Sequence, residues 1–267
     1  MIPYSEIAAE LKKRGVKKAA LQLPEGLKRF APELVSVLRK EGITSIISGD
    51  PCWGACDLSL DAASDADILV HIGHTPVTEE KNVFYVPYRK DIDCAVLEKA
   101  AAVLKKYESV SLTTTIQHSH QTEELAEKLR SLGVNAVVGA GSKRTPEPGQ
   151  VLGCTYASAK NADCAANLFV GTGVFHAIGV SLATKKPTYA LDPYGSGDLQ
   201  EVSADPLLRK RFVQIEKAKK AKSFGILLSS KPGQQRKELA ERLASLHENA
   251  AVILIKEISE MQLRNLG

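Results

Sequence analysis

Residues 19–47 read AALQL-PEGLKRFAPELVSVLRK-EG-ITSII, two short apolar runs around a segment with helical spacing. Within that segment, Leu34 and Leu38 stand four residues apart, which places both on one face of a helix. Gly42 follows the second leucine by four residues, as is typical of a helix end. A strand, a helix and a second strand of this length predict a right-handed crossover and a parallel sheet.

The same plan recurs twice further along the chain. Residues 110–138 and 224–255 each contain an apolar run, an amphipathic segment and a second apolar run. Two of the helical segments have nearly the same sequence, Glu-Leu-Ala-Glu-Lys-Leu at 124–129 and Glu-Leu-Ala-Glu-Arg-Leu at 238–243. The expected helices lie at 24–40, 121–132 and 234–246, and the expected strands at 19–23, 43–47, 110–116, 134–138, 224–229 and 251–255.

Three such units predict an α/β protein of three small domains, each a parallel sheet flanked by helices, related by approximate threefold symmetry. We expect the breaks near residues 96 and 204, which gives domains at 1–95, 96–203 and 204–267. The third contains one strand–helix–strand unit and a helical start, so the sequence predicts a domain that is incomplete at its C-terminus.

The composition is that of an ordinary soluble globular protein. The chain has 267 residues, 44% of them hydrophobic and 25% charged, with a net charge of +4. So small an excess fits an acidic partner but does not indicate direct nucleic-acid binding, and the basic segment 205–222 is expected to be a solvated helix face. No signal-peptide core opens the chain and no apolar run has membrane-spanning length, so we expect a cytoplasmic protein without membrane contact.

Two loop cysteines predict a metal site. Cys56 lies in DPCWGACDL, residues 50–58, just after the apolar run 43–47, which we expect to be a buried strand. Cys154 lies at a comparable place in the second unit, at the end of GQVLGC. Ligands of open α/β sheets gather at the carboxyl ends of the strands, so we expect the two thiols to meet between domains. Five cysteines without an export signal also indicate a reducing compartment, where thiols serve metal binding or catalysis rather than disulfides.

The other cysteines are weaker candidates. Cys52 forms a C-x-x-x-C pair with the first loop thiol, and its role stays open between lining the loop and taking part in the site. The common radical S-adenosylmethionine motif needs a third cysteine three residues on, where this chain has Ser59. Cys94, at an expected helix start, and Cys164, in an expected helix over 158–168, are interpreted as structural.

Soft thiolates select zinc, copper or iron–sulfur clusters. One thiol from each domain, meeting at a central axis, would hold a cubane cluster with three protein ligands and leave its fourth iron free to bind substrate. No cysteine follows Cys164, so the third ligand of such a cluster is not present in this chain.

Three further loops follow expected strands and are candidate binding segments. Residues 23–26 open a helix whose N–H groups could hold an anion such as a carboxylate. The glycines in 171–176 allow close approach to the backbone, as a cradle for adenosine or an amino acid would require. Residues 192–193 begin a glycine-rich loop, in which the aspartate either binds a ribose or ammonium group or caps a turn. The candidate cofactor-binding residues are Leu23, Pro24, Glu25, Gly26, Gly171, Thr172, Gly173, Phe175, His176, Asp192 and Pro193.

Four histidines also follow expected strands. They are His71, His74, His118 and His120. Because no carboxylate stands at ligand spacing from them, they are interpreted as loop residues.

Five motifs in chain order resemble the archaeal diphthamide synthase subunit. They are Leu23-Pro24-Glu25-Gly26-Leu27, Trp53-Gly54-Ala55-Cys56-Asp57, Gly149-Gln150-Val151-Leu152-Gly153-Cys154, Gly171-x-Gly173-x-Phe175-His176 and Leu191-Asp192-Pro193-Tyr194. Gln-Gln-Arg at 234–236 resembles the third domain of the same family. Five motifs in order are far more specific than any one of them alone.

The resemblance implies a homodimer of three-domain protomers with one cluster cysteine per domain. It implies a [4Fe–4S] cluster whose unique iron holds S-adenosylmethionine, with Cys56 as the first ligand and Cys154 as the second. The segments 171–176 and 192–193 would then hold the nucleoside and amino-acid ends of that cofactor.

The resemblance also implies a reaction. An electron donor reduces the cluster, the methionine-side C–S bond of S-adenosylmethionine breaks, and methylthioadenosine leaves. The 3-amino-3-carboxypropyl radical adds to C2 of a histidine of translation elongation factor 2, the first step of diphthamide biosynthesis. The protein's part is to bind and orient the reactants.

Two other functions stay open at this point. A quinolinate-synthase-like dehydratase also uses three α/β domains with one cluster cysteine each, but its cluster acts as a Lewis acid on a small dicarboxylate. A non-catalytic partner subunit that binds a cluster or a nucleotide would explain the missing third thiol. The Trp-Gly-Ala-Cys wording at 53–56 and the Gly-x-Phe-His wording at 173–176 favour the diphthamide enzyme.

Overall fold

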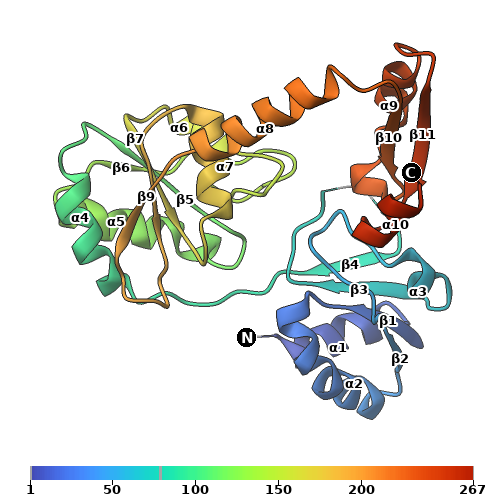
Figure 1. The fold of residues 1–267 in the computed structure, drawn as a ribbon. Coiled ribbons are helices and arrows are strands. Elements are labelled where there is room, and N and C mark those ends of the chain that lie inside the picture. The colour runs from blue at the N-terminus through green and yellow to red at the C-terminus, as the bar shows by residue number, and fades with distance from the viewer. Residues whose placement is uncertain (1, 78–79, 267) are drawn as a thin grey trace.

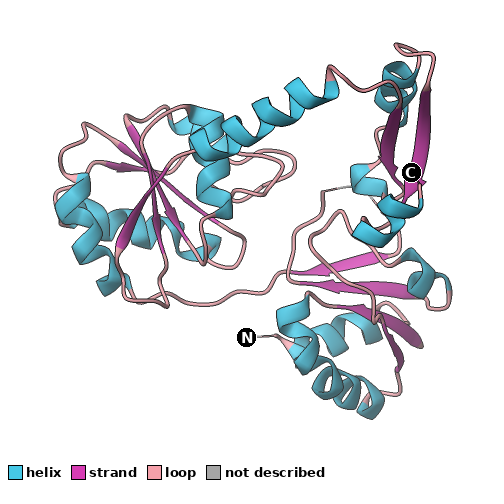
Figure 2. Cartoon of the chain, viewed as in Figure 1, coloured by secondary structure: helices cyan, strands magenta, loops and turns pink. Residues whose placement is uncertain are grey.

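The computed structural model of the chain describes residues 2–77 and 80–266. It has three β-sheets, each with helices packed against it (Figures 1 and 2). The sheets have four, five and two strands in chain order. The α/β class with parallel sheets flanked by helices is therefore confirmed.

The first sheet is fully parallel, in the order β2-β1-β3-β4. Its inner strand β1 is buried except at its first residue, as a strand covered on both faces should be. Helices α1 and α2 cover one face, where Leu11, Leu34 and Leu38 are fully buried, and α3 covers the other. The elements are α1 (Tyr4–Lys13), β1 (Lys18–Gln22), α2 (Ala31–Lys40), β2 (Thr44–Ile47), α3 (Leu60–Ser64), β3 (Ile68–Ile72) and β4 (Val83–Val86).

The second sheet has the order β6-β5-β7-β8-β9. Its first four strands are parallel, while β9 pairs antiparallel with β8, an edge that the sequence pattern did not predict. Helices α4 and α5 cover one face and α6 and α7 the other. The elements are α4 (Leu97–Leu104), β5 (Val110–Thr114), α5 (Thr122–Ser131), β6 (Ala136–Val137), α6 (Ala157–Ala162), β7 (Ala166–Val170), α7 (Phe175–Thr184), β8 (Thr188–Leu191) and β9 (Leu199–Val202).

Residues 224–266 form a smaller C-terminal unit around the parallel pair β10–β11. The long helix α8, none of whose residues is buried, leads from the second sheet to this unit (Figure 1). The unit then lies beside the first sheet, so the chain returns to its beginning. The elements are α8 (Asp205–Ala218), β10 (Phe224–Ser229), α9 (Lys237–Ala244), β11 (Ala250–Ile255) and α10 (Glu260–Asn265), with short 3-10 helices η1 (Glu25–Phe30), η2 (Cys94–Val96), η3 (Ser119–Gln121) and η4 (Pro232–Gln234).

Most expected elements are present, with three corrections. The helix expected over 24–40 is divided, because Pro32 starts a new helix, α2, after η1. Strand β2 was expected to be buried, but it is the edge strand of its sheet, and Ile47 is 44% exposed. The helix expected over 158–168 ends at Ala162, where Asp163 adopts a left-handed conformation, and the next apolar residues form β7.

The two larger sheets share a topology in which the first strand lies between the second and the third. This repetition relates the first two expected units to each other. The threefold relation between them and the domain breaks near residues 96 and 204 stay predictions. Within residues 2–77 and 80–266, no helix is both long and apolar enough to cross a membrane.

Candidate functional site

Cys56 lies in the loop between β2 and α3 and is half-buried. Its Sγ accepts a hydrogen bond from Nε2 of Gln234, at 3.2 Å, although 178 residues separate the two in sequence. A Cβ placed on Gly233 would lie 2.5 Å from Cβ of Cys56. The backbone of η4 in the C-terminal unit therefore packs directly on the Cys56 loop.

Lys231 joins the C-terminal unit to the same loop. Its side chain is only 6% exposed and its Nζ lies 2.9 Å from Oδ1 of Asp57, which is equally buried. Glu257 pairs with the same ammonium group. Burial on its own would lower the pKa of Lys231, but the hydrogen bonds to the two carboxylates outweigh it and raise the pKa above its ordinary value. Lys231 thus remains charged, and its ion pair with Asp57 holds η4 against the residue next to Cys56.

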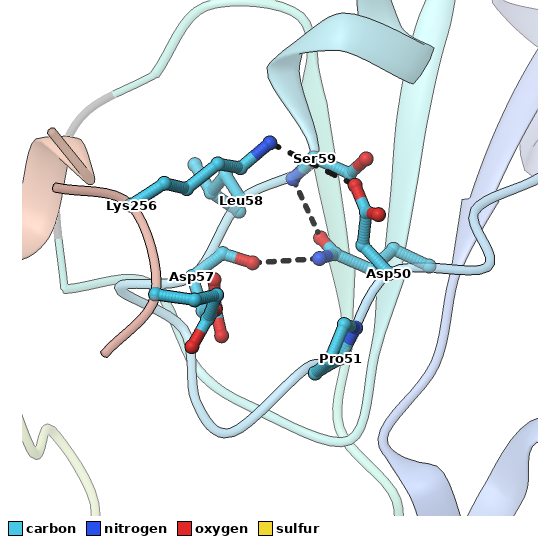
Figure 3. Close-up of a pocket in the computed structure, with 8 residues that line it drawn as sticks. Asp50, Pro51, Asp57, Leu58, Ser59 and Lys256 are labelled. Carbon is cyan, nitrogen blue, oxygen red and sulfur yellow. Dashed lines mark hydrogen bonds and ion pairs between the residues drawn. The ribbon is translucent and has the colours of Figure 1, made fainter. Parts of the chain in front are cut away.

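A small pocket lies where these two parts meet (Figure 3). Gln22 spans it, donating from Nε2 to the carbonyl oxygen of Asp57 and accepting at Oε1 from the N–H of Ser59. Lys256 closes it from the C-terminal unit through an ion pair with Asp61 at 2.9 Å. Its volume of about 80 Å³ is far below the roughly 300 Å³ of typical ligand pockets, so it is no nucleoside site.

Cys154 is exposed, in the loop between β6 and α6. Nη1 of Arg144 donates a hydrogen bond to its Sγ across 3.7 Å. A Cβ on Gly153 would meet the ring of Phe175 at 2.8 Å, so this ring rests against the backbone beside Cys154. Two motifs that the sequence singled out separately are therefore neighbours.

The Cys154 loop also contacts the first sheet. Gln150 is fully buried, and its Nε2 donates to Oγ1 of Thr75 at 3.0 Å. Thr75 belongs to the loop after β3, in which a Cβ on Gly73 would meet Pro24 at 2.9 Å. The loops that carry Pro24, Thr75 and Cys154 thus form one connected series.

The segment 171–176 links β7 to α7, as expected for a cradle between a strand and a helix. Thr172 and Gly173 are exposed, and Gly173 has a φ of +70°, which favours glycine. The imidazole of His176 stacks on Phe169 with ring centroids 5.5 Å apart, and burial lowers its pKa below the ordinary value. His176 is therefore a neutral group at this end of the sheet.

The other candidate loops make local contacts. Asp192 accepts a hydrogen bond at Oδ1 from the N–H of Tyr194, at 3.0 Å, which is the turn-capping alternative. Glu25 forms an ion pair with Lys28 at 2.7 Å, and Leu23 is buried in the first core. Among the contacts of the described residues, none joins Asp192 or Pro193 to Cys56 or Cys154, and cofactor binding by these loops stays a prediction.

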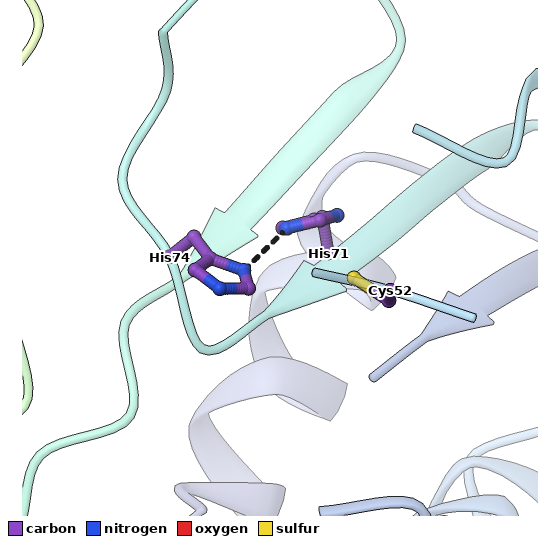
Figure 4. A group of neighbouring side chains, drawn as sticks. All are labelled: Cys52, His71 and His74. Atoms are coloured by element: carbon purple, nitrogen blue, oxygen red, sulfur yellow. Dashed lines mark hydrogen bonds between the residues drawn. The ribbon is translucent and has the colours of Figure 1, made fainter. Parts of the chain in front are cut away.

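One group escaped the sequence analysis. His71 was expected in a loop, but it lies within β3 and is fully buried. Its Nε2 lies 2.9 Å from Nδ1 of His74, and Cys52, which is 2% exposed, completes a cluster (Figure 4). Burial lowers the pKa of His71 to about 3 and that of His74 to about 4, and it raises the pKa of Cys52 to about 12. The His-x-x-His spacing at a strand end was the available signal.

Cys94 and Cys164 have the surroundings expected of structural residues. Cys94 begins η2, where its thiol lies 3.5 Å from Oε1 of Glu124. Cys164 is 3% exposed and follows α6, rather than lying within a helix. Neither contacts Cys56 or Cys154 in the hydrogen bonds of the described residues.

Comparison with known proteins identifies relatives of this chain. A 2-(3-amino-3-carboxypropyl)histidine synthase of Pyrococcus horikoshii is 39% identical over 251 residues, covering 92% of this chain and 73% of that protein. Subunit 1 of the synthase of Mus musculus is 30% identical over 263 residues, covering 94% of this chain and 56% of that subunit. This chain thus spans little more than half of the mouse subunit.

Solved structures agree. The crystal structure of Dph2 from Pyrococcus horikoshii with a 4Fe-4S cluster superposes with a TM-score of 0.92 at 35% identity, covering 99% of this chain and 81% of that one. The family model described as "Putative diphthamide synthesis protein" matches residues 23–267. The chain therefore belongs to the family of diphthamide synthesis proteins.

Proposed function

We propose that this chain transfers the 3-amino-3-carboxypropyl group of S-adenosylmethionine to C2 of a histidine of translation elongation factor 2. The observation that carries the proposal is the likeness, over 99% of the chain, to a Dph2 structure with a 4Fe-4S cluster. The homologous synthase is named after 2-(3-amino-3-carboxypropyl)histidine, which is the product of this transfer. The family match favours this reaction over the dehydratase and the non-catalytic subunit.

Cys56 and Cys154 are the proposed ligands of the cluster, and their surroundings fit the role. Each sulfur accepts a hydrogen bond from a protein group, Gln234 in one case and Arg144 in the other. Hydrogen bonds to the ligating sulfurs are one means by which a protein adjusts a cluster. When bound, the cluster supplies the electron that cleaves the sulfonium of S-adenosylmethionine.

The remaining roles are orientation and exclusion of water. We propose that the exposed backbone of Thr172 and Gly173 receives the nucleoside, beside the ring of Phe175 and the neutral imidazole of His176. The proposed amino-acid contacts are Asp192 and Pro193, with the η1 end at residues 23–26 for the carboxylate. These groups hold a reactive carbon in place, which is the protein's share of such chemistry.

The proposal extends to the setting of the reaction. We infer a homodimer in the cytoplasm, reduced by a separate electron donor, with the elongation factor as protein substrate and without direct nucleic-acid or membrane partners. The domains 1–95, 96–203 and 204–267 are proposed as its structural units. The homodimer, the electron donor and the protein substrate rest on the family resemblance, and the other statements rest on the sequence patterns.

The test is a product assay on anaerobically reconstituted protein. With reductant, S-adenosylmethionine and elongation factor 2, we expect methylthioadenosine and a factor heavier by one aminocarboxypropyl group, detected by mass spectrometry. Cys56→Ala is expected to lose both products, because the proposed ligand set loses a thiolate. Cys94→Ala is the matched control: its thiol contacts Glu124 and lies outside the proposed site, so product should form as in the unchanged chain.

Three outcomes contradict the proposal or a part of it. A cluster that leaves S-adenosylmethionine intact but lets the protein dehydrate a small dicarboxylate supports the dehydratase. Failure to form any cluster under reconstitution supports the non-catalytic subunit. Equal product from Cys56→Ala and Cys94→Ala would exclude Cys56 as a ligand.

A further inference from the structure

Three groups that commonly bind metal ions meet next to the Cys56 side chain without including it. They are Sγ of Cys52 and one ring nitrogen each of His71 and His74, all within 4.8 Å of one another (Figure 4). Cys52 comes from the loop between β2 and α3, while the two histidines come from the end of β3 and the turn after it. Side chains from two separate segments thus converge on one point.

The hydrogen bonds fix the tautomer of His71. Nε2 of Gln22 donates to the carbonyl oxygen of Asp57, and Oε1 accepts from the N–H of Ser59, which sets the orientation of the amide. Nδ1 of His71, at 2.9 Å from the same Oε1, must therefore be the donor. The lone pair of His71 lies on Nε2, which faces His74. A ligating histidine held by a hydrogen bond at its other nitrogen is the usual arrangement in metal sites.

The proton of the hydrogen bond between His71 and His74 lies where a metal ion could bind both imidazoles. With its lone pair on Nε2, His71 accepts the proton of Nδ1 of His74 across 2.9 Å. Two nitrogens bound to one zinc ion at 2.0–2.1 Å in tetrahedral geometry stand about 3.3 Å apart, so the two imidazole nitrogens would have to separate by only a few tenths of an ångström. His74 would then carry its proton on Nε2, and Cys52 would release its thiol proton to solvent.

The surroundings suit such a ligand set. His71 is fully buried and Cys52 is 2% exposed, so neither is solvated by bulk water. Burial also keeps both imidazoles neutral, which is the form that binds metal. Asp57 is the acidic group that acts on both Cys52 and His74, and Lys28 is the cation that acts on Cys52.

We propose that Cys52, His71 and His74 form a second metal site, which binds a zinc-like divalent ion through one thiolate and two imidazoles. Mixed sulfur and nitrogen ligands select zinc over magnesium or calcium, and three protein ligands leave the fourth position open. The ion would tie the loop that carries Cys56 to the end of β3. The inference rests on this geometry alone and holds whether or not the proposed reaction is right.

Cobalt(II) titration tests the site, because thiolate ligation gives an intense charge-transfer absorption that zinc abolishes on displacing cobalt. The full chain with Cys56→Ser and Cys154→Ser is used after chelator treatment and under reducing, anaerobic conditions, so that neither proposed cluster thiol contributes. We expect one equivalent of cobalt with a sulfur band. Cys52→Ser should remove the band, and His74→Gln should weaken binding by more than the roughly 10–100-fold typical of losing an outer-shell partner. Cys164→Ser, a buried cysteine of the other sheet, should change nothing.

A sulfur band that survives Cys52→Ser, or no binding by protein whose circular dichroism is native, overturns the proposal. If a variant does not fold, X-ray absorption of the zinc-loaded background chain decides. One sulfur and two imidazole nitrogens around zinc support the site, and a shell of oxygens alone contradicts it.

Discussion

Replacing Lys231 by methionine is expected to detach the C-terminal unit from the Cys56 loop. The Lys231 side chain is 6% exposed, and its ammonium group pairs with the carboxylate of the equally buried Asp57 side chain, as well as with Glu257. Methionine removes the charge and leaves Asp57 buried without its counter-ion. Breaking one partner of a buried pair costs about 3–5 kcal/mol, because the remaining charge is uncompensated.

The same ion pair predicts a pH dependence. The pKa of Lys231 is raised above its ordinary value of 10.5 by the hydrogen bonds to Glu257 and Asp57, which outweigh the opposing effect of burial. A group with a raised pKa in the folded state stabilises the fold fully below its unfolded pKa. We therefore expect the contribution to be lost only as the pH rises above about 10.5 and through the raised value.

Hydrogen exchange is the measurement for Lys231→Met, since the unit can detach without unfolding the rest of the chain. Faster exchange is expected in β10, β11 and residues 50–58. Lys256→Met is the matched control: it joins the same two parts, but its side chain is 48% exposed, and such pairs contribute about 0–1 kcal/mol. Equal exchange in the two variants would show that burial of the Lys231 pair adds nothing.

Local patterns predicted the units of the fold well, because each unit is a strand–helix–strand whose apolar spacing is self-contained. The helix stripe of Leu34 and Leu38 is fully buried, and the strand expected at 224–229 is β10. What the patterns could not give was the order of strands. A short β-branched run such as 43–47 looks the same at the centre and at the edge of a sheet, and only tertiary pairing made β2 an edge.

The candidate site could likewise be predicted from local sequence only in part. Sequence pointed to Cys56, Cys154 and Phe175 through wording and loop position, and the structure places Phe175 against the glycine before Cys154. The sequence could not reveal that Gln234 donates a hydrogen bond to Cys56, because contacts across 178 residues leave no local signal. Nor could it find the cluster of Cys52 with two histidines, since His71 lies within a strand whose pattern indicates only burial.

Gly233→Ala is expected to disrupt the same interface by a steric route. The added Cβ would lie 2.5 Å from Cβ and 2.7 Å from Cα of Cys56, and the Cα belongs to the backbone and cannot rotate away. The η4 turn must therefore move off the loop, at a cost of roughly 1–3 kcal/mol or more, and the hydrogen bond from Gln234 is lost. The measurements are hydrogen exchange in β10 and β11 and iron bound per chain after reconstitution, both compared with Gly49→Ala.

Gly49 is a stringent control, because it lies in the same loop between β2 and α3 and a Cβ there meets no atom within 4 Å. Its change should stay within about 0.5 kcal/mol. If Gly233 and Lys231 act through one contact, the double variant should cost less than the sum of the two single ones, because a unit that has already detached loses nothing further. Additive costs would instead mean that the η4 turn and the ion pair attach separate parts of the C-terminal unit. The amount of iron bound would then be lowered by Gly233→Ala alone.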